Sequence, residues 1–252
     1  MTFGHSMVPM HASPKKRREN PAREELILDV ARELLLDGGY HGLTMARIAE
    51  GVDYSKGTVY QHFACKEEVI IALATRSVEK QQALVERAAL FPGRPRERML
   101  AVAEATQLFS ILYAADTRIF QIMNGEAITQ KGTVDSLWRL KHAANHTVAI
   151  MSGIVRDAVA QGDLVYRGDL ALKDLLFHIW LLGEAGKASA GNWLPPSELG
   201  ISRTFESLIR STQLMADAYE WRPLTTEWDY DESLRRIRKE LFAEESKRAY
   251  GG

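Results

Sequence analysis

Residues 44–66, TMARIAEGVDYSKGTVYQHFACK, contain two short helical patterns separated by a turn. The first, over 45–52, repeats apolar residues at the three- and four-residue spacing of one helix face. The second, over 55–63, has only Val59 and Phe63 as apolar anchors, and its other positions carry hydrogen-bonding side chains or glycine. Two short helices joined by a tight turn, with a third helix packed behind them, are the parts of a helix-turn-helix unit.

Helix start and stop signals surround this stretch. A preceding helix is expected from Asn20-Pro21, a capping residue followed by proline, to Gly38-Gly39, where glycine accepts the left-handed conformation that ends a helix. Thr44 is expected to cap the second helix and Ser55 the third. A fourth helix is expected from Lys66 to about Leu90.

Helical periodicity also dominates the rest of the chain, and no convincing alternating strand pattern occurs. The sequence therefore predicts an all-α fold, with a break at FPGRPRE (91–97) before a second helical region. Its helices are expected over 97–113, 116–128, 133–161, 169–189, 201–219 and 229–248. The apolar surface of 169–189 runs nearly all round, which predicts a helix covered on every side. The expected domains are a disordered basic arm (1–19), a helix-turn-helix domain (20–66) and a larger helical domain (67–252).

Composition limits the function classes. The net charge is -1, so any nucleic-acid binding must come from a local patch. Cys65 is the only cysteine, which excludes an intrachain disulfide and a CxxC metal site. Apolar runs stay below the roughly 18 residues of a membrane span, and the first residues lack the apolar core of a secretory signal. A cytoplasmic protein without a membrane partner is expected.

The second short helix has the residue types of a DNA-reading helix. The major groove of DNA is wide enough for a helix, and it presents a distinct donor and acceptor pattern for each base pair. Val59 and Phe63 would face the core of the unit. The residues left for DNA are Lys56, Gly57, Thr58, Tyr60, Gln61 and His62.

Residues 22–73 resemble the DNA-binding domain of the TetR family of transcriptional regulators, through Gly39-Tyr40, LTMARIAE, YSKGTVYQHF and KEEVI. The resemblance implies a DNA-binding surface that includes the turn, the capping residue Ser55 of the third helix, and the start of the fourth helix. Contacts to the phosphate backbone are implied for Thr44, Tyr60, His62 and Lys66, base contacts for Lys56, Gly57, Thr58 and Gln61, and either kind for Tyr54.

The chemistry of these side chains agrees with the implied roles. Lysine reaches O6 or N7 of guanine, and glutamine pairs with N6 and N7 of adenine. Lys66 and the basic segment 15–18 (KKRR) would make binding sensitive to salt. Asp53 stands where the family commonly has glycine, and aspartate tolerates the left-handed dihedrals that such a turn requires.

The same resemblance implies a homodimer that binds a small-molecule effector in its larger domain. The expected interface pairs helices 169–189 and 201–219, through Leu176, Ile179, Gly183, Gly186, Phe205, Leu208, Thr212 and Met215. A face of 133–161 that mixes aromatic and polar groups, together with residues of two earlier helices, predicts an effector pocket. The pocket residues are Phe109, Tyr113, Phe120, Met123, Asn124, Trp138, His142, Asn145 and His146.

The main prediction is a repressor that a hydrophobic effector releases from a pseudo-palindromic operator. The alternatives are an activator, an effector-independent DNA-binding protein, and a metal-dependent enzyme built on a helical bundle. His142 and His146 have a spacing that suits one metal ion, but two ligands are too few, so no metal and no cofactor are expected. The sequence lacks GxSxG, a P-loop and a strand followed by GxGxxG, and therefore no enzyme is expected.

Overall fold

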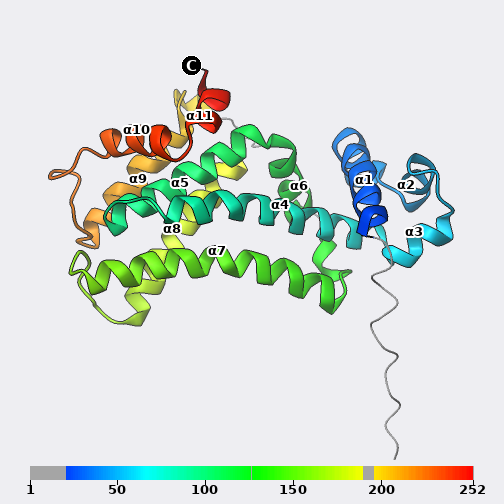
Figure 1. Ribbon diagram of the computed structural model, residues 1–252, viewed down its shortest axis with the longest axis horizontal. Coiled ribbons are helices and arrows are strands. Elements are labelled where there is room, and N and C mark those ends of the chain that lie inside the picture. Colours follow the sequence, from blue (N-terminus) through cyan, green and yellow to red (C-terminus); the bar gives the residue numbers. More distant parts are fainter. Residues whose placement is uncertain (1–20, 126, 190–195, 252) are drawn as a thin grey trace, which may run out of the picture. The chain divides into compact units, whose positions relative to one another are not determined.

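The computed structural model describes residues 21–125, 127–189 and 196–251, and these residues form helices without any strand (Figure 1). This confirms the predicted all-α fold. The chain divides into two compact units after Val69, which lies near the start of the fourth helix. The predicted basic arm (1–19) and the expected capping residue Asn20 lie outside the described residues.

The first unit consists of α1 (Pro21–Gly42), α2 (Met45–Gly51), α3 (Lys56–His62) and the first turn of α4 (Lys66–Ala89). Each of these helices contributes apolar side chains to a common core. Short helices are marginally stable by themselves, so packing in this core stabilises them. The helical dihedrals of α1 are interrupted at Gly39 (φ 63°), where the sequence predicts its end. Fully buried core residues are Ile27, Ala31, Leu35, Leu43, Ile48 and Val59.

The predicted caps and turn are confirmed. The hydroxyl of Thr44 accepts a hydrogen bond from the backbone N–H of Arg47 (3.2 Å). The hydroxyl of Ser55 accepts one from the backbone N–H of Thr58 (3.1 Å). Asp53, between the two helices, has a φ of 54°, which is the left-handed conformation expected for this position. Two caps and one left-handed residue therefore fix the direction in which α3 leaves the turn.

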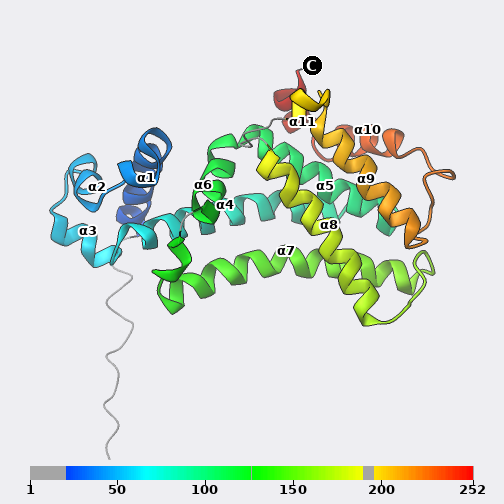
Figure 2. The same ribbon diagram turned by 180° about the vertical axis from the view of Figure 1, so that it is seen from behind.

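The second unit is built around α5 (Pro95–Leu112), which packs against all the α-helices that follow it (Figures 1 and 2). Helices α7 and α8 also contact each other, and α8 lies beside α9. The other elements of the unit are α6 (Ala114–Gly125), η2 (Ala127–Gln130), α7 (Val134–Ala160), α8 (Asp169–Ser189), η3 (Pro196–Leu199), α9 (Thr204–Ala218), α10 (Tyr230–Glu240) and α11 (Ala243–Tyr250).

One prediction about these helices is wrong. The tail over 229–248 is not one helix, because the chain turns at Leu241 and Phe242 and places the fully buried Phe242 ring in the core between α10 and α11. The apolar surface of α8 is only partly covered by its own chain. Phe177 is 52% exposed, and Trp180 and Leu181 are each 46% exposed.

Arg96 on α5 holds the second unit together from within. Its side chain is 1% exposed and donates through Nε to the side-chain oxygen of Gln213 (3.0 Å) and through Nη2 to the Gln213 carbonyl (2.7 Å). Nη1 donates to the carbonyls of Trp221 and Pro223 and pairs with Asp217. A buried cation needs this many acceptors to offset its lost hydration. Arg96 therefore fixes α5 to α9 and to the segment that follows α9.

Candidate DNA-reading surface and ligand cavity

Helix α3 buries its apolar anchors and exposes most of its polar residues. Val59 is 0% exposed and Phe63 is 5% exposed, so both face the core of the first unit. Lys56, Gly57, Tyr60 and Gln61, which we call the α3 surface, are all exposed. Within the described part of the chain, the side chains of Lys56, Tyr60 and Gln61 make no hydrogen bond, so they are available to an external partner.

The remaining predicted DNA-binding residues flank this surface. Thr44 is exposed at the start of α2, and His62 is half-buried at the end of α3. The hydroxyls of Ser55 and Thr58 lie 2.9 Å apart and bond to each other, so both belong to the cap of α3. Tyr54, in the turn, is half-buried, and the guanidinium of Arg23 lies 5.8 Å from the centre of its ring.

Lys66 makes contacts that the sequence does not reveal. Its ammonium group donates to the carbonyl of Tyr40 (2.8 Å) and lies 3.7 Å from the centre of the Tyr40 ring. The Tyr40 hydroxyl donates in turn to the buried carboxylate of Glu67 (2.6 Å). These bonds fix the start of α4 to the end of α1. A phosphate contact by Lys66 stays a prediction, and it would have to share this ammonium with Tyr40.

Arg47 is an exposed cation that is not among the predicted DNA-binding residues. It lies in the first turn of α2, and its Nη1 donates to the carbonyl of Gly42 (2.6 Å). The signal was present in the sequence, because Arg47 follows the capping Thr44 by three residues and a helix N-terminus already favours anions. An arginine at this place adds positive charge beside Thr44.

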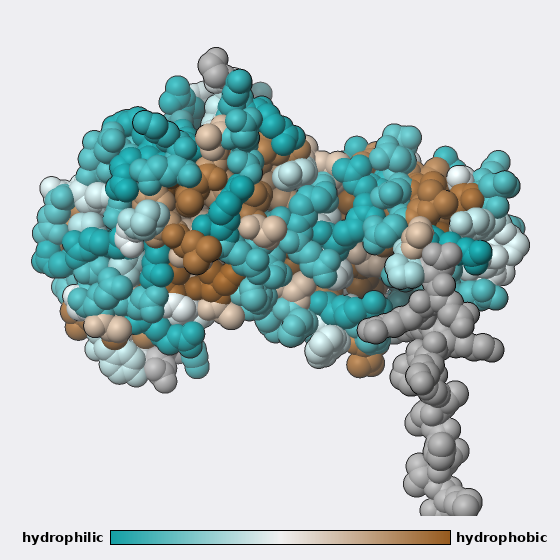
Figure 3. All heavy atoms as spheres, viewed as in Figure 1, coloured by the Kyte–Doolittle hydropathy of each residue, from teal (hydrophilic) through white to brown (hydrophobic). Residues whose placement is uncertain are grey.

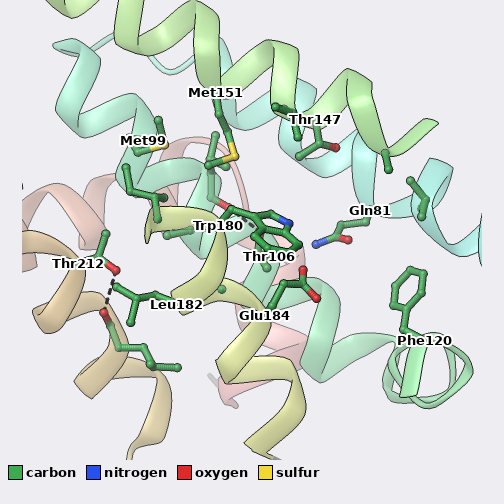
Figure 4. A pocket seen from close by; sticks show the side chains of 18 of the residues that line it. Gln81, Met99, Thr106, Phe120, Thr147, Met151, Trp180, Leu182, Glu184 and Thr212 are labelled. Carbon is green, nitrogen blue, oxygen red and sulfur yellow. Dashed lines mark hydrogen bonds between the residues drawn. The ribbon is translucent and has the colours of Figure 1, made fainter. Parts of the chain in front are cut away.

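The second unit contains a cavity of about 550 Å³, which we call the ligand cavity, between residues of α4 to α9 (Figure 4). Most of its wall is apolar, as is typical of sites for small organic molecules. Apolar wall residues include Met99, Val102, Phe120, Met123, Met151 and Phe205. Polar wall residues include Gln81, Thr106, Lys141, Thr147, Glu184 and Thr212.

Three of the residues predicted for an effector pocket, Phe120, Met123 and Asn124, line this cavity. The other six do not. Phe109 is fully buried in the core, and the ring of Tyr113 packs against it with centroids 5.4 Å apart. The remaining four, Trp138, His142, Asn145 and His146, lie on the exposed side of α7.

The predicted residues of α7 therefore lie outside the ligand cavity, and a contact between them and an effector stays a prediction. Trp138 is 60% exposed and stacks on His142 with centroids 4.9 Å apart, while His146 pairs with Glu86 (2.9 Å). These three side chains therefore have partners of their own at the protein surface. The cavity is bounded instead by the face that the sequence assigns to core packing, which includes Lys141, Ala144, Val148 and Met151.

The residues predicted for a dimer interface are all half-buried, and most of them border the cavity or the core of their own chain. Ile179, Gly183, Phe205, Leu208 and Thr212 line the cavity, and Leu176 and Met215 pack against the core. A Cβ atom at Gly186 would lie 2.8 Å from Cδ1 of Leu208, so this glycine lets α8 approach α9 of the same chain. The exposed apolar side chains of these two helices are Phe177, Trp180, Leu181 and Leu214. The predicted interface positions therefore differ from the most exposed apolar positions of these helices, and the interface stays a prediction.

The metal alternative gains no support, and the surroundings of the single cysteine do not favour a reactive thiol. The residues that the structure describes contain no group of three or more His, Cys, Asp or Glu side chains placed to hold a metal ion. Cys65 is half-buried, and burial raises the pKa of its thiol, which disfavours the reactive thiolate. None of the helices in the described ranges is long and apolar enough to cross a membrane.

The face of the protein drawn in Figure 3 is largely hydrophilic, with apolar patches between the polar side chains. The first unit is a helix-turn-helix module, the class of unit that places its second short helix in the major groove of DNA. The second unit is a helical unit with an apolar cavity. This combination is typical of regulators that join DNA binding to ligand binding in one chain.

Comparisons with known proteins agree with this class. Residues 27–73 match the family model described as bacterial regulatory proteins, tetR family. The chain is 31% identical over 122 residues to the HTH-type transcriptional repressor KstR of Mycolicibacterium smegmatis. The aligned region covers 47% of this chain and 58% of that protein. It is 35% identical over 83 residues to the HTH-type transcriptional activator FasR of the same organism, covering 33% of this chain and 38% of that protein.

The fold is also shared with solved structures. A bacterial regulatory protein in the tetR family from Rhodococcus RHA1 aligns with a TM-score of 0.59 and 17% identity, over 79% of this chain and 98% of that one. The helix-turn-helix region of the chain is therefore similar to that of the tetR family of bacterial regulatory proteins, and the fold of the chain is similar to that of a solved member. The matched region spans little more than half the length of the repressor KstR.

Proposed function

We propose that the protein is a transcriptional repressor that binds double-stranded DNA through the α3 surface and is released by a small hydrophobic effector. The observation that carries this proposal is the exposure of Lys56, Tyr60 and Gln61 on a helix that is capped by Ser55 and anchored by Val59. A helix with this division presents donors to base edges while its back remains in the core.

A homodimer would bring two copies of α3 to one stretch of DNA, and a two-fold dimer predicts a pseudo-palindromic operator. The exposed apolar side chains Phe177, Leu181 and Leu214 on α8 and α9 support an interface on the outer side of these helices. Leu214→Glu combined with Phe177→Glu is expected to give a monomer by light scattering. A dimer that survives both substitutions would place the interface elsewhere.

The ligand cavity supports the regulatory half of the proposal. Val78 and Gln81 of α4 contribute to its wall, and the same helix begins at Lys66 in the first unit. A ligand that favours one position of α4 would shift the balance between conformations with high and low DNA affinity. Such coupling requires only that the effector bind the two conformations unequally.

An activator is the second candidate. The relative FasR is named a transcriptional activator and matches this chain over 83 residues. The geometry of the α3 surface is the same for both functions, because the sign of regulation depends on where the operator lies relative to the promoter. Transcription from the promoter beside the operator, with and without the protein, distinguishes a repressor from an activator.

Retention of fragmented genomic DNA by the purified protein, followed by sequencing, tests the DNA-binding proposal. A single enriched pseudo-palindrome is the expected result, and it would also identify the neighbouring genes. The matched variant Tyr60→Ala removes one exposed side chain of α3 and should weaken retention without changing the thermal midpoint. No retention at low salt, where phosphate contacts are strongest, would overturn the proposal.

A further inference from the structure

We propose that the second unit carries a separate binding site for a small phosphate monoester, in a pocket of about 280 Å³ between α9 and α10. We call it the arginine pocket, because its wall includes Arg203, Arg210, Arg235 and Arg238. This site goes beyond the proposed function, since it depends neither on DNA binding nor on an effector in the ligand cavity.

The charge of the wall favours an anion. Four arginines line the arginine pocket, against the two carboxylates of Glu206 and Asp231, so these residues carry a formal charge of +2. The planar guanidinium group presents its donors in a fixed fork that matches the oxygen atoms of a phosphate. The wall therefore has the residue type that phosphate recognition requires.

Arg238 is already fixed in position at this wall. Its Nε donates to Oε1 of Glu104 (2.8 Å) and its Nη2 donates to Oε2 (3.2 Å), and Glu104 is 0% exposed. The guanidinium carbon also lies 4.4 Å from the centre of the Tyr250 ring. Nη1 of Arg238 has no hydrogen-bond partner among the described residues, so it can donate to a ligand. A side chain that is ordered before binding loses little conformational freedom when the ligand arrives.

Arg210 supplies a second cation from the neighbouring helix. Its exposed side chain makes no hydrogen bond and no ion pair with any other residue that the structure describes. Arg203 and Arg235, in contrast, each pair with the glutamate three positions away in the sequence, at 3.1 and 2.6 Å. Arg210 on α9 and Arg238 on α10 are therefore the two arginines with donors left for a shared anion.

Asp231 is the group to weigh against an anion, because it also lines the arginine pocket. Its carboxylate is exposed, so water screens its repulsion of a ligand. A phosphate monoester has three free oxygen atoms and a charge of about -2 at pH 8, whereas a carboxylate has two oxygen atoms and one charge. Two arginines from different helices can bind the three oxygen atoms of a phosphate at once, which favours the phosphate.

The organic part of the ligand is set by the rest of the wall. Ile209 and Leu234 are buried and Tyr230 is half-buried, and all three line the arginine pocket. They offer an apolar surface and one aromatic ring. A volume of about 280 Å³ lies just below the range that is typical of drug-sized ligands, so the organic group should be compact, with the size of a single ring.

Calorimetry on the full-length chain tests the inference with three probes: phenyl phosphate, benzoate and benzyl alcohol. The titrations are done at pH 8 and low ionic strength, in a buffer without phosphate, because salt screens exposed charges. We expect phenyl phosphate to bind at least about 10-fold more tightly than benzoate, which corresponds to one additional charged hydrogen bond, and benzyl alcohol to give no measurable binding.

Two variants with the same loss of charge locate the site. Arg210→Gln should weaken the binding of phenyl phosphate at least about 10-fold. Arg118→Gln is the matched control, because Arg118 is also exposed, has no partner among the described residues and lies outside the arginine pocket. It should change the affinity less than about 2-fold, whereas Asp231→Asn should increase the affinity about 2- to 5-fold. Thermal midpoints of the variants show that each is folded.

Four results would overturn the inference. They are no binding of phenyl phosphate at millimolar concentration, equal losses in Arg210→Gln and Arg118→Gln, benzoate binding as tightly as phenyl phosphate, and a loss in Lys56→Gln in place of Arg210→Gln. The last of these would put the anion on the α3 surface. The titrations contain no DNA, so their outcome leaves the proposed function to its own test.

Discussion

The α3 surface consists of exposed residues that follow one another within two turns of one helix, whereas the ligand cavity is lined by residues between Val78 and Gln213. The α3 surface needs only a capped helix and two anchors, Val59 and Phe63, to point its side chains outward. The cavity exists only where helices from α4 to α9 leave a space between them. The first site is therefore local in the sequence, and the second depends on packing throughout the larger unit.

The substitution Arg96→Ala should have the largest effect, and it acts on the unit that contains the ligand cavity. It leaves Asp217 and the acceptors of Gln213, Trp221 and Pro223 without their buried donor. Removing one partner of a buried ion pair costs about 3–5 kcal/mol, so the free energy of unfolding measured in urea should fall by that amount. The exposed pair Arg139–Asp135 provides the control, because Arg139→Ala should cost less than about 1 kcal/mol. Equal losses in the two variants would contradict the role given to Arg96.

Two glycines of the first unit should respond in opposite ways. A Cβ atom at Gly57 would have Ser55 Oγ as its nearest neighbour, at 3.7 Å, so Gly57→Ala should fold normally and even stabilise α3 by up to about 1 kcal/mol. On DNA the added methyl would obstruct a close backbone approach and weaken binding about 10-fold or more. A Cβ at Gly51 would lie 2.5 Å from Cγ1 of Val30, so Gly51→Ala should lower stability by about 1–3 kcal/mol.

Thermal midpoints and binding isotherms on one DNA fragment measure both effects. Gly57→Ala should lower only the affinity, and Gly51→Ala should lower the midpoint. If Gly57→Ala binds DNA as tightly as the native chain, the backbone of α3 does not approach the DNA closely.

Filling the cavity should impair ligand binding and spare DNA binding. Ala144 and Ala149 are both exposed positions on α7, about one and a half turns apart, but only Ala144 lines the cavity. Ala144→Trp should therefore lower the affinity for the apolar dye Nile red at least about 10-fold, a loss of roughly 1.4 kcal/mol. Ala149→Trp should have little effect. The assignment of the cavity would be wrong if the two variants bound the dye equally well.

The smallest expected effect is a dependence of stability on pH through Asp217. Burial raises the pKa of this carboxyl group, but hydrogen bonds from Thr225 and the charge of Arg96 outweigh burial and hold the pKa below its usual range. A lowered pKa means that Asp217 contributes its full stabilisation of the fold at pH values above 3.8, the ordinary pKa of an aspartate. This contribution is lost as the pH falls through the lower, folded-state pKa. Asp217→Asn should therefore be less stable than the native chain at pH 6, and the difference should shrink on acidification.

Predictability from the sequence follows the same division between local and distant structure. Thr44 and Ser55 were recognisable as caps because each hydroxyl accepts from the backbone N–H three positions later, and Asp53 as the left-handed residue because the turn requires that conformation. The cavity was less predictable. Helix α7 has two faces of plausible composition, and nothing near Trp138 in the sequence reveals that its ring stacks on His142 at the surface.

Helix α8 shows the same limit in another form. Its apolar character was evident, but the periodicity cannot distinguish a side chain that packs within the chain from one that a second chain covers. Phe177 and Leu181 are exposed, whereas Ile179 and Gly183 line the cavity, and these positions alternate within two turns. The contact between Arg96 and Asp217 joins residues more than a hundred positions apart, so no local pattern announces it.

Selection of binding sites from random double-stranded DNA, carried out side by side with the native chain and Gln61→Ala, tests the central claim most directly. If α3 reads bases, the native chain should enrich one pseudo-palindrome. Gln61→Ala should then lose its preference at one symmetric pair of positions, with a loss of about 1–3 kcal/mol of discrimination at each. An identical consensus for Gln61→Ala and for variants of Lys56 and Tyr60, or no consensus for the native chain, would contradict the account.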